Sequence, residues 1–124
     1  MNMFKVTNEV RGILLKSKEI VGYVEDKIFP VMAPENTAGD YIIYQRDGYK
    51  QEYSKMGVAR QTPLVNVIAI SEDYGRSQDL ASLIYDSLSG AWTDPDMYIR
   101  LEDSTEGFID NKYIQVLQFS ISSL

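Results

Sequence analysis

The feature that most constrains this chain is an alternating apolar strand that leads directly into an amphipathic helix. Residues 64–70 form the strand, because they are rich in the β-branched side chains that pack well on a pleated sheet. The helix that follows carries apolar residues at helical spacing, namely Leu80, Ala81, Ile84 and Leu88. The carboxylate of Asp73 can cap the free backbone amides of this helix, and Gly90 can end it.

Further strands are predicted on both sides of this strand–helix unit. Strands are predicted at residues 98–103 and 113–121, because alternate residues there form two distinct faces. Residues 110–111 supply a turn between these two strands. Residues 41–46 are β-branched and aromatic, which also predicts a strand. Residues 27–32 are apolar but contain a proline, which cannot donate a hydrogen bond to a sheet. This last segment is therefore an edge strand or an extended loop.

A first helix is predicted near the N-terminus, with its exit at residues 20–22. Its apolar face consists of Val6, Val10, Ile13 and Leu14. The complete order is helix, short strand, two strands, helix, two strands. It predicts an α+β fold in one domain, residues 1–124, with a mostly antiparallel sheet of four to five strands and two helices packed on one face. Each strand has one polar face, which indicates a sheet covered on one side only.

Residues 47–62 are the least regular part of the chain, since they are polar and show neither clean alternation nor a helical stripe. We therefore predict that they form a long hairpin arm between two strands, projecting from the domain. Loops of this length are uncommon unless they are functional or disordered, so the arm is a candidate functional segment. Tyr, Arg and Met are enriched at protein interfaces. The predicted interface residues are Arg46, Tyr49, Lys50, Tyr53, Lys55, Met56 and Arg60. The alternatives are a variable surface loop and a platform on which nucleic-acid bases stack.

Composition excludes several classes of active site. The chain has no His and no Cys, so a Ser-His-Asp triad, a thiolate nucleophile and a Cys-based zinc site are excluded. No glycine-rich phosphate-binding motif is present, and we expect no cofactor. The net charge of −6 argues against tight, non-specific binding to nucleic acid, which requires Lys and Arg to neutralise phosphates. The longest apolar runs are too short to span a bilayer.

Carboxylates are the remaining polar candidates. Glu102, Asp103 and Glu106 lie close together in the sequence. Such residues are usually solvated, because carboxylates that do chemistry need a buried site that perturbs them. Two other interpretations stay open, namely an acidic patch that faces a lumen and a carboxylate site that binds a cation or catalyses a reaction. We predict no catalytic residue and no metal ligand.

The order of these segments resembles that of the small tail-completion, or tail-terminator, proteins of long-tailed bacteriophages and prophages. The resemblance covers nearly the whole chain and depends on pattern more than on signature residues. It comprises the N-terminal helix, Lys27-Ile28-Phe29-Pro30-Val31-Met32, Tyr41-Ile42-Ile43-Tyr44, the polar arm, Ile68-Ala69-Ile70-Ser71, Gln78-Asp79-Leu80-Ala81, Leu88-Ser89-Gly90 and the final Gln118-Phe119-Ser120-Ile121. The family has no catalysis, so none of these residues is a catalytic signature.

This resemblance implies a subunit of a ring, commonly a hexamer, that terminates the tail tube and joins it to the head connector proteins. DNA would pass through the ring without specific binding, and the arm would reach a neighbouring subunit or the tail-tube protein. The protein would be located in the virion tail, and in the host cytoplasm during assembly. The residues alone also allow a non-viral α+β adaptor that binds one partner through residues 47–62.

Overall fold

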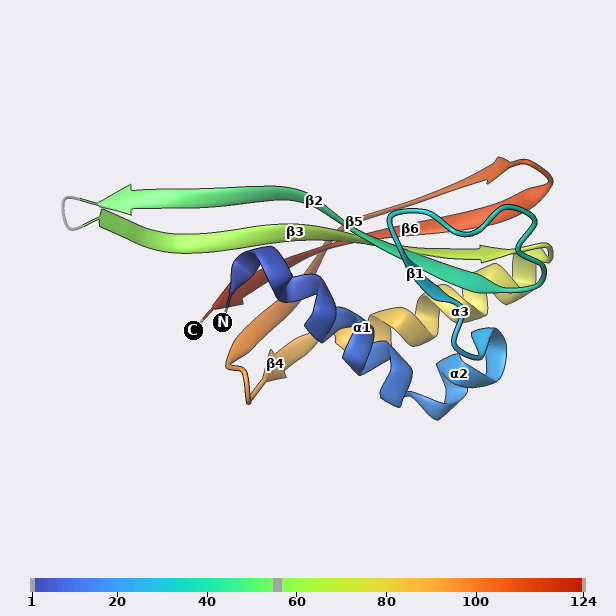
Figure 1. Cartoon of the computed structure of the whole chain (residues 1–124), viewed down its shortest axis with the longest axis horizontal. Coiled ribbons are helices and arrows are strands. Elements are labelled where there is room, and N and C mark those ends of the chain that lie inside the picture. The colour runs from blue at the N-terminus through green and yellow to red at the C-terminus, as the bar shows by residue number, and fades with distance from the viewer. Residues whose placement is uncertain (1, 55–56, 124) are drawn as a thin grey trace.

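The computed structural model describes residues 2–54 and 57–123, with the backbone alone at residues 3, 49–54, 57–61 and 123 (Figure 1). The elements in chain order are η1 (Met3–Lys5), α1 (Val6–Lys16), α2 (Lys18–Val24), β1 (Ile28–Pro30), β2 (Tyr41–Ser54), β3 (Gly57–Ser71), α3 (Tyr74–Leu88), β4 (Gly90–Trp92), β5 (Met97–Ile109) and β6 (Lys112–Ser123).

The strands form one sheet in the order β1-β2-β3-β6-β5-β4. β1 runs parallel to β2, and every other pair of neighbours is antiparallel. The α+β class is therefore confirmed, and β1 is an edge strand. The expected counts were too low: the described ranges hold six strands, three α-helices and one 3₁₀ helix. The additional strand is β4, a three-residue edge strand that pairs only with the start of β5.

All three α-helices lie on one face of the sheet, with α3 against β3 and β6 at its centre (Figure 1). α1 and α2 pack beside α3 and reach β2. The core between helices and sheet consists of side chains that are almost fully buried, among them Leu14, Ile20, Val65, Leu80, Ile84, Leu88 and Phe119. The predicted helical stripe thus faces the sheet, because its 3.6-residue period places these side chains on one side of α3.

The first helix is interrupted at Ser17, where one continuous helix was expected. Ser17 has extended backbone angles, and its Oγ accepts a hydrogen bond from the backbone N–H of Ile20 at 3.3 Å. A serine that caps the second helix in this way stabilises a new helix start. The break lets Leu14 and Ile20, on separate helices, both enter the core. No helix in the described part of the chain has the length and apolar character needed to cross a bilayer.

The start of α3 follows the prediction. The side chain of Asp73 accepts a hydrogen bond from the backbone N–H of Arg76 at 2.9 Å, which satisfies a free amide of the first turn. The helix ends at Leu88, and Gly90 adopts a φ of +117° directly after it. A residue with a side chain is strained at that angle, so glycine is suited to the abrupt change of direction into β4.

Two hairpins extend the sheet at opposite ends of the molecule (Figure 1). At one end, β2 and β3 continue as the predicted arm. At the other end, β5 and β6 pair as far as Ile109 and Lys112, so β5 extends six residues beyond the predicted strand. The predicted turn at Asp110 and Asn111 is confirmed. Both residues have a positive φ, the geometry of the two-residue turns that match the twist of a hairpin.

The face of the sheet away from the helices is not polar at its centre, which corrects the expectation of one polar face. Ile43 lies opposite Ile68, and Ile70 lies opposite Ile114, on strands β2, β3 and β6. Ile70 is buried and the other three are half-buried. The reason is that the loop between β1 and β2 folds back over part of this open face and shields these positions from water. Apolar side chains there stabilise the fold because their surface is removed from water.

Candidate assembly surfaces

The arm is a two-stranded ribbon. β3 has β6 as its second neighbour only from Leu64 onward, where Leu64 lies opposite Ser120. Beyond that point β2 and β3 pair only with each other among the described strands, as far as Ser54 and Gly57. A two-stranded hairpin is marginally stable in water unless something packs against it. The ribbon therefore presents two unpaired strand edges that a partner can cover.

The structure places the backbones of five of the seven predicted interface residues along this ribbon. Arg46 is exposed at its base, and its guanidinium carbon lies 4.7 Å from the ring centre of Phe4, a cation–π contact that ties the arm to the N-terminus. The backbones of four others lie in the paired strands, but their side chains are outside the described residues; they are Tyr49, Lys50, Tyr53 and Arg60. Lys55 and Met56 lie wholly outside the described residues.

The three acidic residues singled out in the sequence do not gather on one face. Asp103 lies opposite Gln118, on the open face, whereas Glu106 lies opposite Gln115, on the helix face. Glu102 sits at a register shift in β5 and accepts a hydrogen bond from Ser120 Oγ at 2.7 Å. The strand period of two residues explains the separation, because positions three apart point to opposite faces.

Glu106 belongs instead to a cluster at the start of α3. Tyr74 donates its hydroxyl proton to the Glu106 carboxylate, at 3.1 Å to Oε1 and 2.9 Å to Oε2. The Tyr74 ring lies 5.4 Å from that of Tyr113, which in turn lies 4.8 Å from Phe108. The hydrogen bond to Glu106 raises the pKa of Tyr74 above its ordinary value of 10.0. These contacts hold the β5–β6 hairpin against the helix.

We expect Glu106→Gln to return the pKa of Tyr74 toward its ordinary value. The raised pKa means that the hydroxyl form of Tyr74 stabilises the fold below pH 10.0, and that this contribution is lost as the pH rises through the raised pKa. The measurement is an absorbance titration of tyrosinate with and without the Glu106→Gln change. In each case the curve of the matching protein with Tyr74→Phe is subtracted, so that the difference reports Tyr74 alone. An identical titration of Tyr74 in both proteins would contradict the assignment.

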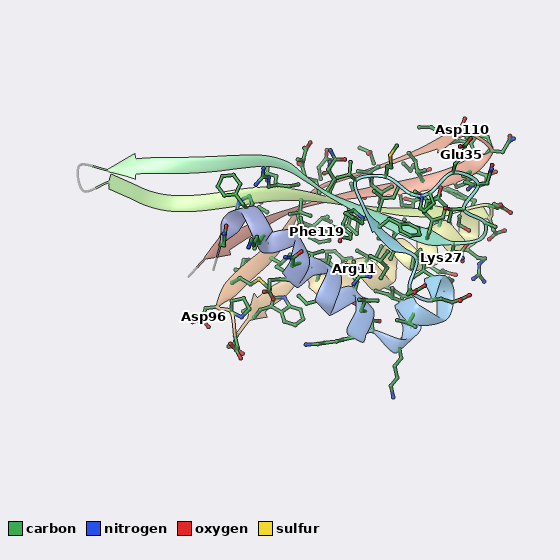
Figure 2. All side chains as sticks on the ribbon, in the orientation of Figure 1. Arg11, Lys27, Glu35, Asp96, Asp110 and Phe119 are labelled. Atoms are coloured by element: carbon green, nitrogen blue, oxygen red, sulfur yellow. The ribbon has the colours of Figure 1, made fainter. Side chains whose placement is uncertain are left out.

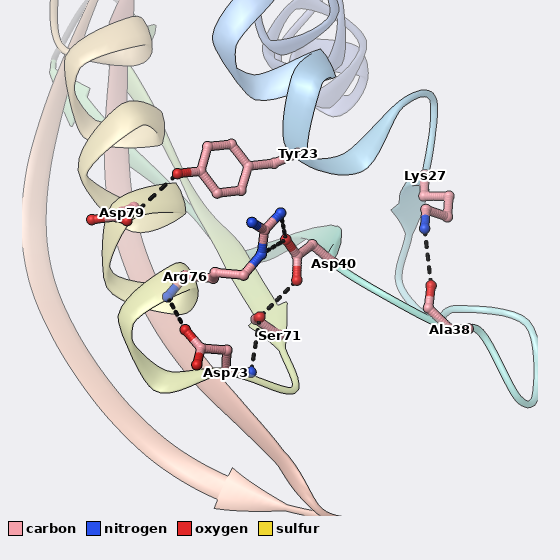
Figure 3. A network of polar contacts seen from close by, with 8 residues as sticks. All are labelled: Tyr23, Lys27, Ala38, Asp40, Ser71, Asp73, Arg76 and Asp79. Atoms are coloured by element: carbon pink, nitrogen blue, oxygen red, sulfur yellow. Dashed lines mark hydrogen bonds and ion pairs between the residues drawn. The ribbon is translucent and has the colours of Figure 1, made fainter.

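A polar network around the buried carboxylate of Asp40 joins the β1–β2 loop to α3 (Figure 3). Asp40, which is 6% exposed, accepts hydrogen bonds from Ser71 Oγ at 2.6 Å and from Arg76 Nε at 2.8 Å. The guanidinium of Arg76 also lies over the ring of Tyr23, 4.6 Å from its centre. The hydrogen bond to Asp40 raises the pKa of Arg76 above its usual value. The loop is held at a second point by Lys27, whose Nζ donates to the carbonyl of Ala38 at 2.9 Å.

A hollow of about 610 Å³ lies under this loop on the open face. Its walls come from the loop, from the centre of the sheet and from the turn end of the β5–β6 hairpin. They include Val31, Pro34, Ile43, Ile68, Ile109 and Ile114. Sequence reasoning missed the hollow, because its walls are far apart in the chain and only the apolar character of residues 27–32 hinted at it.

The rim of the hollow is strained. Val31 has a φ of +66°, which is a genuine outlier for a β-branched residue. Its peptide forms a γ-turn, in which the N–H of Met32 donates to the carbonyl of Pro30 at 2.7 Å. The N–H of Val31 donates to the carbonyl of Tyr44 at 2.9 Å, which fixes the turn on β2. As a result, Val31 is 62% and Met32 75% exposed.

Comparison with known proteins gives a likeness of fold. No protein family matches the sequence, and no curated protein matches it. Among solved structures, the chain is similar to a chain in the virion of a native gene transfer agent particle, with a TM-score of 0.78 and 14% sequence identity. The match covers 92% of this chain and 90% of the other. The chain therefore has the fold of a component of that virion.

Proposed function

We propose that this protein is a structural subunit of a phage-like virion, and that it forms a ring which terminates the tail tube and joins it to the head connector. The observation that carries the proposal is the likeness of fold, over about nine-tenths of both chains, to a chain of the gene transfer agent virion. The resemblance of the sequence to tail-completion proteins supports the finer assignment to the tail.

The arm supports self-association as the way in which the ring is built. A subunit that projects a ribbon from one end can contact the next subunit head to tail, and a ring results when the rotation between neighbours closes. The net charge of −6 suits a ring that lets DNA pass without holding its phosphates. The proposed role is structural, without catalysis or a cofactor, in the virion tail and, during assembly, in the host cytoplasm.

Native mass spectrometry of the purified chain over a concentration series, with and without a candidate tail-tube protein, tests this function. We expect one discrete closed oligomer, or tubes that carry a cap of this protein at one end in electron micrographs. A chain that remains monomeric and ignores tail tubes would overturn the proposal. A chain that binds a single copy of another protein through residues 47–62 would favour the adaptor instead.

A further inference from the structure

We propose that the hollow on the open face receives the hairpin arm, residues 47–62, of a second copy of this chain. The proposal rests on the self-association proposed above and adds the surface that the arm meets. That surface consists of the strained turn at Val31, the exposed side chain of Met32, the apolar centre of the sheet and the end of β5 at Ile109.

The rim of the hollow has the properties of a protein interaction site. Val31, Met32 and Ile109 are each more than half exposed, and they line the same hollow as the apolar side chains of Ile43 and Ile114. Exposed apolar side chains that gather in this way mark interaction sites more often than those scattered singly. Strain at Val31 points the same way, because strained backbone persists where the surroundings enforce it and clusters at functional sites.

Charge selects the arm as the occupant. In residues 47–62 three basic residues stand against two acidic ones, so the arm has a net positive charge in a chain whose net charge is −6. The hollow has Glu35 and Asp110 on its rim, both exposed. The lysine beside them, Lys112, is engaged under the loop, where its Nζ donates to the carbonyl of Thr37 at 2.7 Å. A basic arm therefore meets an acidic rim, and such complementarity selects partners and register.

Position makes the contact head to tail. Glu35 and Asp110 lie at the end of the molecule farthest from the arm (Figure 2). One copy cannot place its own arm in its own hollow, since the arm and the β5–β6 turn that borders the hollow lie at opposite ends of a single sheet (Figure 1). The arm, which pairs with no third strand among those that the structure describes, would gain a packed surface on the next subunit.

Paramagnetic relaxation enhancement between two copies tests the contact directly. The chain has no Cys, so Ser54→Cys gives a single site for a nitroxide near the end of the arm. This labelled protein is mixed with ¹⁵N-labelled wild-type chain, and the amide signals of the ¹⁵N copy are recorded. We expect selective broadening at residues 31–36 and 109–110. A nitroxide at Ser82→Cys, on the exposed side of α3, is the matched control and should not produce this pattern.

Charge variants provide a second, independent test. Glu35→Lys with Asp110→Asn should weaken the association about 10- to 100-fold, because like charges would then face each other. Asn keeps the positive φ of the turn at position 110. Lys50→Glu with Arg60→Glu should weaken it similarly. A mixture of the rim variant and the arm variant should yield pairs through the restored charge complementarity of the two altered surfaces.

The outcomes separate this proposal from the proposed function. Broadening confined to the arm itself, broadening spread evenly over the surface or no broadening at all would overturn the arm-in-hollow contact. Caps on tail tubes that form equally well with the rim variant would also overturn it and leave the virion role intact. Conversely, selective broadening in a protein that never caps a tube would support the contact and count against the role in the tail.

Discussion

Replacing residues 51–61 with an Asn-Gly turn is expected to yield a folded protein that lacks the proposed self-association. The replacement keeps the pairs Tyr49–Pro63 and Lys50–Thr62 and closes them with the turn sequence that best fits a two-residue hairpin. The deleted segment lies beyond the last pairing of β3 with β6, so the core is untouched. We expect the free energy of unfolding to change by less than about 1 kcal/mol, as for other surface changes.

Two measurements check this expectation. Urea unfolding reports whether the shortened chain keeps its stability, and native mass spectrometry over a concentration series reports whether it assembles. Asp86→Ala, on an exposed position of α3, is the control that should alter neither. If the shortened chain assembles as the full chain does, then the arm is not the self-association surface.

Asp40→Ala is expected to lower the free energy of unfolding by about 2–3 kcal/mol, the second large effect. A buried carboxylate that accepts bonds from a hydroxyl and a guanidinium contributes more than a neutral pair. Its removal leaves the Ser71 hydroxyl, 1% exposed, with only the amide of Asp73 as a partner. Arg76 is half-exposed and recovers part of its hydration, so the loss stays below the cost of breaking a fully buried ion pair.

Asp79→Ala separates this effect from a general loss of charge on α3. The Asp79 carboxylate accepts only a long bond, 3.5 Å, from the exposed hydroxyl of Tyr23. We therefore expect a change within about 0.5 kcal/mol. The measurement is chemical unfolding of both variants at neutral pH. Equal losses in the two variants would mean that the Asp40 network does not stabilise the loop.

The sequence predicts those elements that pack against the core, because their apolar residues recur at the spacing of a strand or a helix. Alternate residues of 64–70 and most of the stripe of α3 are fully buried at the centre of the fold, so burial determines which of their positions are apolar. The arm could be predicted as well, because its irregular polar composition departs from its neighbours. The cap at Asp73 and the turn at Asp110 follow from local hydrogen bonding and backbone preference alone.

The outer half of β5 could not be predicted in the same way. Residues 104–109 are exposed on both sides, so no alternation of apolar and polar side chains marks them as a strand. β4 is a strand only because β5 lies beside it, since three residues carry too little pattern. The hollow depends on the positive φ of Val31, which the residue type disfavours and only tertiary contacts enforce.

The bulge at the base of the arm has a consequence for how many copies the proposed ring would contain. The register of β2 and β3 shifts between Arg46 and Gly48, and Asp47, the extra residue, accepts a bond from Gln118 on β6 at 2.7 Å. A bulge bends its strand and re-aims what lies beyond it. In a head-to-tail assembly the direction of the arm fixes the rotation per subunit. In the proposed ring, deleting Asp47 would therefore change the copy number, or open the ring into a helix, while the two proposed contact surfaces stay the same.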